Sequence, residues 1–186
     1  TSRAVAADPS VCEPPNVVVV LDRSSSMNGA IAGGPTKWAA ARTALDQVLA
    51  TYDQSIGFGL MTFPFPDACG AGRTPLGETL GAAADPAWMA GYVPDAVVVI
   101  TDGFQWCSPY DPAQRELPTQ AVERLRQHGI RTFVVGFGAA VDEQALATMA
   151  VLGGTAPAGC DATATDPARR CFHQADDAAA LSGALM

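Results

Sequence analysis

Two carboxylates and two hydroxyls stand in short polar loops, and each loop directly follows a run of β-branched residues. Asp22, Ser24 and Ser26 form an Asp-x-Ser-x-Ser pattern, and Asp102 lies within a Thr-Asp-Gly segment. Side chains at alternate positions of a loop that leaves a strand can turn toward one point. Hard divalent cations such as Mg²⁺ prefer all-oxygen ligand sets of this kind. We therefore expect these four side chains to form a divalent cation site.

A site of this composition favours binding over catalysis. A metal held mainly by neutral hydroxyls keeps strong Lewis acidity for one further anionic ligand. The chain has no HExxH or GxSxG motif and only two histidines, so we expect no enzyme activity. As alternatives, Ser24 and Ser26 could cap a following turn, and Asp102 could be a turn residue before Gly103. Those alternatives explain each residue singly but not the whole set.

Apolar runs along the chain predict the elements that position these loops. A run that is apolar at every position is typical of a strand buried on both faces of a sheet. We expect strands at residues 16–21, 56–63, 96–100 and 132–135. Apolar residues at helical spacing predict helices at residues 38–49, 119–127, 141–152 and 176–185. Thr36 is placed to cap the first helix, and Gly129 to end the second in a left-handed conformation.

This alternation predicts an α/β fold of the Rossmann-like, doubly wound type, with a mainly parallel sheet and helices on both faces. In such folds, ligands bind beyond the carboxyl ends of the strands, which is where both polar loops lie. A chain of 186 residues has room for one ordinary domain. We expect an N-terminal extension at residues 1–15 and a single domain at residues 16–186.

The order of these motifs resembles the von Willebrand factor type A (VWA) family. The metal-ion-dependent adhesion site (MIDAS) of that family combines a DxSxS loop, a separate threonine and a separate aspartate. The matching residues in this chain are Asp22, Ser24, Ser26, Thr74 and Asp102. The resemblance continues through residues 135–138, a helix start at 142–146 and a final short strand near 171–173, so it covers nearly the whole chain.

The resemblance implies a role for each ligand. The two serines and Thr74 would coordinate Mg²⁺, or Mn²⁺ or Ca²⁺ as alternative ions, through their hydroxyls. The two aspartates would act through bound water, and the sixth position would take a Glu or Asp of a protein partner. Only residues 64–73 separate Thr74 from the preceding strand, where the family normally has a helix and a longer loop.

The five cysteines predict disulfides rather than a zinc site. They are spaced too widely for the paired ligands of zinc, and disulfides form in oxidising compartments. We expect one bond between Cys160 and Cys171, closing a short loop, and a second between Cys69 and Cys107. Cys12 is then left over. Buried free thiols are the alternative.

The charge balance narrows the choice of partners. With 11 Lys and Arg against 19 Asp and Glu, the net charge is −8, and no basic cluster is present to bind nucleic acid or an acidic membrane surface. The apolar runs are too short to span a membrane. Residues 1–7 lack the basic start and long apolar stretch of a secretory signal.

These observations favour a secreted or bacterial envelope adhesion module that binds a protein partner. A richness in Ala, Gly and Pro suggests the bacterial origin. The alternatives are an intracellular scaffold subunit of a metal-chelatase or AAA-type assembly, and a domain whose loops are merely stapled by the ion. Trp106, four residues after Asp102, is a candidate for the rim around the ligand.

Overall fold

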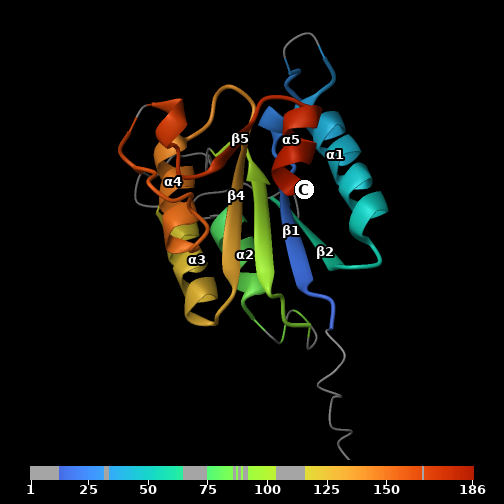
Figure 1. Cartoon of the computed structure of the whole chain (residues 1–186), viewed down its shortest axis with the longest axis vertical. Helices are drawn as coiled ribbons and strands as arrows, with labels where there is room; N and C mark the ends of the chain where they lie inside the picture. Colours follow the sequence, from blue (N-terminus) through green and yellow to red (C-terminus); the bar gives the residue numbers. More distant parts are fainter. Residues whose placement is uncertain are drawn as a thin grey trace, which may run out of the picture.

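The fold is a five-stranded parallel sheet with helices on both faces, as predicted (Figure 1). It was obtained as a computed structural model, which describes residues 13–31, 34–64, 75–85, 87, 89, 92–103, 116–164 and 166–186. The strand order is β2-β1-β3-β4-β5. Their bounds are Asn16–Asp22 for β1, Gly57–Phe63 for β2, Ala96–Thr101 for β3, Arg131–Phe137 for β4 and His173–Ala175 for β5.

The helices lie between the strands and cover the sheet. Their bounds are Lys37–Tyr52 for α1, Pro75–Ala83 for α2, Leu117–Gln127 for α3, Glu143–Leu152 for α4 and Ala178–Leu185 for α5. In the part of the chain that the structure describes, short 3-10 helices η1 at Ser25–Asn28 and η3 at Pro167–Arg169 shape the loops. The predicted end signals are confirmed. Thr36 Oγ1 accepts a hydrogen bond from Ala39 N at 3.1 Å, and Gly129 ends α3 with a φ of +80°.

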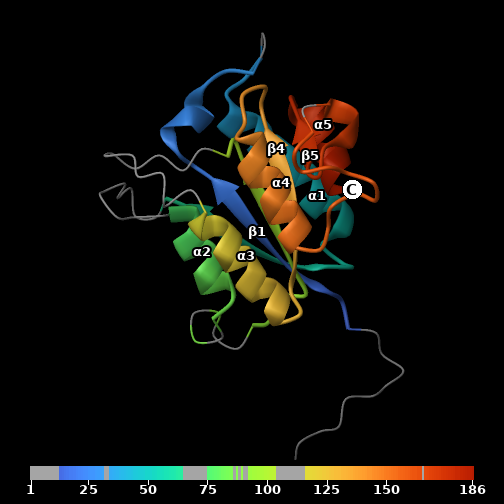
Figure 2. The same ribbon diagram turned by 90° about the vertical axis from the view of Figure 1, so that its left-hand side faces the viewer.

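The buried residues of β1 alternate between the two faces of the sheet. Val18 and Val20 pack with α2, α3 and α4, whereas Val19 and Leu21 pack with α1 and α5. Figure 2 shows α2 and α3 on one side of the sheet and α1 and α5 on the other. All four side chains are nearly or fully buried. A strand with an apolar core on each side must be apolar at every position, which is why the run of valines predicted β1 correctly.

Helix α2 was not predicted, because Gly77, Thr79 and Gly81 are poor helix formers. The packing of α2 against α3 explains one of them. A Cβ atom on Gly77 would lie 3.3 Å from the backbone of Leu117 and Pro118, so glycine allows the two helices to approach closely. The final strand was expected near residues 171–173, and β5 in fact begins at His173.

Cys160 and Cys171 form a disulfide, as predicted. The bond closes the loop between α4 and β5, and Cys171 is buried in the core beside Phe172. Cys12, Cys69 and Cys107 lie outside the described residues, so their pairing stays a prediction. Among the helices that the structure describes, none is long and apolar enough to cross a membrane.

Candidate metal centre

The two loops singled out in the sequence meet where the sheet changes winding direction. Strand β1 pairs in parallel with β2 on one side and with β3 on the other. The chain therefore adds β2 on one side of β1 and the later strands on the other, and the switch point lies between β1 and β3. Ligands of open parallel sheets bind at such a point, beyond the carboxyl ends of the strands. Leu21 is in register with Ile100, and this pairing places Asp22 beside Thr101.

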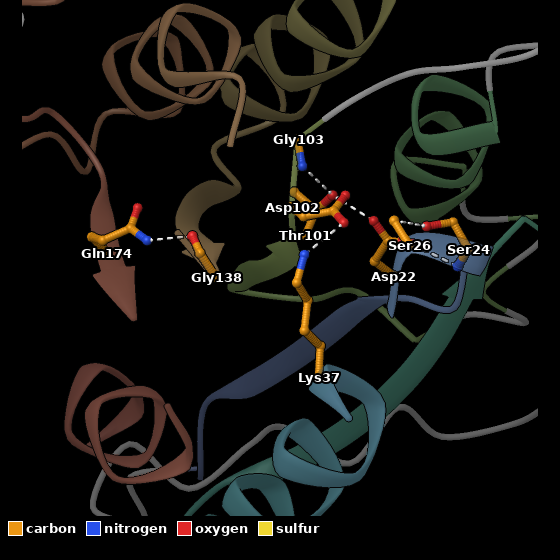
Figure 3. Close-up of polar contacts among 9 residues, drawn as sticks. All are labelled: Asp22, Ser24, Ser26, Lys37, Thr101, Asp102, Gly103, Gly138 and Gln174. Carbon is orange, nitrogen blue, oxygen red and sulfur yellow. Dashed lines mark hydrogen bonds and ion pairs between the residues drawn. The ribbon is translucent and has the colours of Figure 1, made fainter. Parts of the chain in front are cut away.

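Asp22 is held by hydrogen bonds to both of its carboxylate oxygens. Oδ1 accepts from the backbone N–H of Ser24 at 2.8 Å, and Oδ2 accepts from the hydroxyl of Thr101 at 2.7 Å (Figure 3). Thr101 Oγ1 in turn accepts from Gly103 N at 2.9 Å. This chain of bonds joins the ends of β1 and β3. Thr101 was not predicted to take part in the site, although it lies directly before Asp102 in the sequence.

Ser24 and Ser26 present neighbouring hydroxyls at the start of η1. Their Oγ atoms are hydrogen bonded at 2.8 Å. Ser24 occupies the N-cap position of η1, but its side chain makes no capping hydrogen bond, so the capping alternative does not explain this serine. Met27 is 1% exposed and anchors η1 in the core, which leaves the serine hydroxyls at the surface of the site.

Asp102 brings a second buried carboxylate from the end of β3. It is 3% exposed, and Asp22 is 1% exposed. Its Oδ2 forms an ion pair of 3.1 Å with Lys37 Nζ, at the first residue of α1. Asp102 therefore takes part in an electrostatic cluster, which the turn-residue alternative does not explain.

The environment of Asp22 disfavours its charge. Burial raises the pKa of this carboxyl above its ordinary range, hydrogen bonds from Ser24 and Thr101 oppose that rise, and the nearby negative charge of Asp102 adds to it. Two buried carboxylates of this kind are stabilised by a cation placed between them and solvent.

The donor set fits a hard divalent cation that is bound partly through water. Ligands next to each other around octahedral Mg²⁺ are about 3 Å apart when the metal–oxygen distance is about 2.1 Å. The serine hydroxyls, at 2.8 Å, have this separation. Among the described residues, no group of three or more His, Cys, Asp and Glu side chains could hold a metal ion. The candidate centre depends on hydroxyls instead.

Four of the five predicted ligands are brought to this edge of the sheet: Asp22, Ser24, Ser26 and Asp102. Thr74 and Trp106 lie outside the described residues, so the threonine ligand and the tryptophan rim stay predictions. Lys37 was missed. The sequence feature that could have indicated its role is a positively charged residue at the start of a helix whose first turn has no acidic residue.

Comparison with known proteins shows the family of the chain. The sequence profile of the von Willebrand factor type A domain matches residues 70–184. The chain belongs to the von Willebrand factor type A domain family. No curated protein has a sequence that matches this VWA chain.

Solved structures resemble the VWA chain in fold at low sequence identity. Proximal thread matrix protein 1 from the mussel byssus has a TM-score of 0.55 at 14% identity, over 92% of this chain and 44% of its own. The pilus adhesin SpaC of Lactobacillus rhamnosus GG has a TM-score of 0.61 at 14% identity, over 95% and 30%. The PilB minor pilin of Streptococcus sanguinis has a TM-score of 0.60 at 12% identity, over 96% and 61%. The VWA chain thus spans less than two thirds of each.

Gly103 fixes the backbone next to Asp102, and we expect Gly103→Ala to disturb the site. Its φ of +90° is unfavourable for alanine, and an added Cβ would lie 2.8 Å from the backbone N of Asp142. Strain of this kind costs about 1–3 kcal/mol of stability. The expected results are a lower melting temperature and weaker Mg²⁺ binding, measured by thermal unfolding and calorimetry.

Gly129→Ala is the matched control for this variant. Gly129 has a similar φ of +80°, but an added Cβ would meet nothing within 4 Å. It should therefore cost only the backbone strain, about 1–2 kcal/mol, and leave Mg²⁺ binding intact. Equal costs for the two variants, with unchanged Mg²⁺ binding in both, would show that Gly103 does not position Asp102.

Proposed function

We propose that this VWA domain, residues 16–186, is a non-enzymatic binding module that holds Mg²⁺ in a MIDAS and captures a carboxylate of a protein partner. The observation that carries the proposal is the meeting of two buried carboxylates and two adjacent serine hydroxyls where β1 and β3 end. Mn²⁺ and Ca²⁺ are alternative ions. A related structure, of the mussel byssus protein with a zinc-occupied MIDAS, supports a divalent cation at this family's site.

Each residue has a distinct part in the proposed site. Ser24 and Ser26 would be direct ligands, together with Thr74. Asp22 already accepts two hydrogen bonds from the protein, so it would hold ligand water and orient the loop rather than bind directly. A divalent ion would supply a Lewis acid for the carboxylate of the partner. The neutral hydroxyls donate little negative charge, which preserves that attraction.

The proposed location is extracellular or at the bacterial cell surface. The disulfide between Cys160 and Cys171 supports an oxidising compartment and weighs against the intracellular scaffold alternative. The pilus and byssus proteins that share the fold are consistent with adhesion outside the cell.

The capture of a carboxylate is tested with N-acetyl-glutamate amide as the probe. Backbone amide signals of Ser24, Ser26 and Gly103 are followed by NMR as the probe is added in Mg²⁺ or in chelator. We expect shifts at these signals only in Mg²⁺. The uncharged isostere N-acetyl-glutamine amide is the control, and it should cause none.

The same titration separates capture from a purely structural role of the ion. If Mg²⁺ raised the melting temperature but the glutamate probe never bound, the ion would only staple the loops. Equal shifts with the glutamate and glutamine probes, or equal shifts in chelator, would also contradict the proposal.

A further inference from the structure

Lys37 places an ammonium group inside the candidate metal centre. It is the only lysine in the chain and the first residue of α1. Its Nζ lies 3.1 Å from Asp102 Oδ2, and the two side chains are 15% and 4% exposed. Figure 3 shows the side chain reaching from α1 to Asp102 at the end of β3. The ammonium therefore faces Asp102, one of the two carboxylates that the divalent ion would neutralise.

This position is unfavourable for a lysine unless something in the site stabilises it. A helix N-terminus carries partial positive charge, which repels a cation, and α1 has no acidic residue in its first turn. Withdrawing an ammonium group from water also costs free energy unless the group is paired. Asp102 supplies the pairing, so the lysine and the metal-site aspartate stabilise each other.

The surrounding backbone makes room for this side chain. Gly138 follows β4 with a φ of +98°, and an added Cβ would lie 2.7 Å from Lys37 Cε and 3.2 Å from Nζ. The carbonyl of Gly138 accepts a hydrogen bond of 2.7 Å from Nε2 of Gln174, which lies in β5 (Figure 3). The glycine after β4, which Gln174 of β5 holds in place, thus leaves room for the side chain that pairs with Asp102.

We propose that Lys37 is a built-in cation of the site, which lowers its affinity for Mg²⁺ and raises its attraction for the carboxylate of a partner. This inference rests on the proposed function. Two carboxylates and one ammonium leave the site with one net negative charge, and a divalent ion would change this to one net positive charge. Without Lys37, the same site would hold the ion more tightly but would be neutral toward the partner.

Lys37→Met tests the inference, because methionine keeps the apolar stem and removes the charge. Calorimetry is expected to show that Mg²⁺ binds about tenfold more tightly to the variant, since a nearby positive charge has been removed. In chelator, the melting temperature of the variant should fall, because Asp102 loses its partner. Saturating Mg²⁺ should restore it. N-acetyl-glutamate amide should bind the Mg²⁺-saturated variant more weakly than wild type.

Arg42→Met is the matched control, since it removes one positive charge from an exposed position of the same helix. It should leave Mg²⁺ affinity unchanged. Equal or weaker Mg²⁺ binding by Lys37→Met, or a loss of melting temperature that is the same with and without Mg²⁺, would mean that Lys37 is only structural, while the proposed function would stand. If neither wild type nor the variant bound Mg²⁺, the proposed function itself would fail.

Discussion

Asp22→Asn is expected to weaken Mg²⁺ binding by about 10–100-fold, the usual cost of losing an outer-shell partner of a metal site. The same variant should raise the melting temperature of the metal-free protein. Burial raises the pKa of Asp22, so its ionised form opposes folding. Stability linked to this group is present below its unfolded pKa and is lost as the pH rises through its higher folded pKa. Asparagine stays neutral and avoids that loss.

Thermal unfolding of wild type and Asp22→Asn, each in chelator and in Mg²⁺, separates the loss of metal affinity from the gain in metal-free stability. At 100 times its dissociation constant, an ion stabilises the folded state by about 2.7 kcal/mol. In a chain of this size, that is about 5–10 °C in melting temperature. The variant, which binds the ion more weakly, should gain only part of it at the same Mg²⁺ concentration. In chelator at neutral pH the variant should melt higher, and this advantage should shrink as the pH is lowered.

Asp46→Asn is the control for this comparison, because Asp46 lies exposed on α1. It should respond to Mg²⁺ as wild type does. An Asp22→Asn protein that gains the same melting temperature from Mg²⁺ would exclude Asp22 from the site. If Asp22→Asn melted lower than wild type in chelator at every pH, the hydrogen bonds that the Asp22 carboxylate accepts would stabilise the fold by more than the burial of its charge destabilises it.

Removing the disulfide with Cys160→Ala and Cys171→Ala together is expected to lower the melting temperature strongly. The bond links residues 11 apart in sequence. Closing a loop of about this length lowers the entropy of the unfolded chain and so stabilises the fold by about 3 kcal/mol. The corresponding change is about 6–12 °C. It should be the same with and without Mg²⁺, because the loop lies between α4 and β5, in a different part of the chain from the loops of the candidate site.

A reducing agent provides the control for the double variant. It should lower the melting temperature of wild type toward that of the variant and leave the variant unchanged. Mass spectrometry of the native protein should find Cys160 and Cys171 joined. Free thiols at both positions would contradict the disulfide and with it the proposed location outside the cell.

The strands could be predicted because their environment demands one kind of residue. The runs at residues 16–21 and 96–100 became the central strands β1 and β3, which carry apolar cores on both faces. Helix α2 could not be predicted from propensity, since its glycines are explained only by close packing against α3. Tertiary contacts here outweigh the local preference of the sequence.

In the candidate site too, some residues could be predicted from the sequence and others depend on tertiary contacts. Asp22, Ser24, Ser26 and Asp102 could be chosen because parallel strands deliver their loops to one edge of the sheet. The contacts that the Thr101 hydroxyl and the Lys37 ammonium make with the two aspartates could not be predicted, because they depend on the register of β1 with β3 and on where α1 begins. Contacts between residues 65 and 79 positions apart carry no periodic signal in the sequence.

Calorimetric titration of Mg²⁺ into wild type and into Ser24→Ala/Ser26→Ala tests the metal centre most directly. Losing one outer-shell partner already costs about 10–100-fold in affinity, so losing both hydroxyls should cost at least about 100-fold. Ser55→Ala, at an exposed position before β2, is the control. We expect one Mg²⁺ bound per chain by wild type and by the control, with binding lost in the double variant. Equal Mg²⁺ affinity in all three proteins would contradict it.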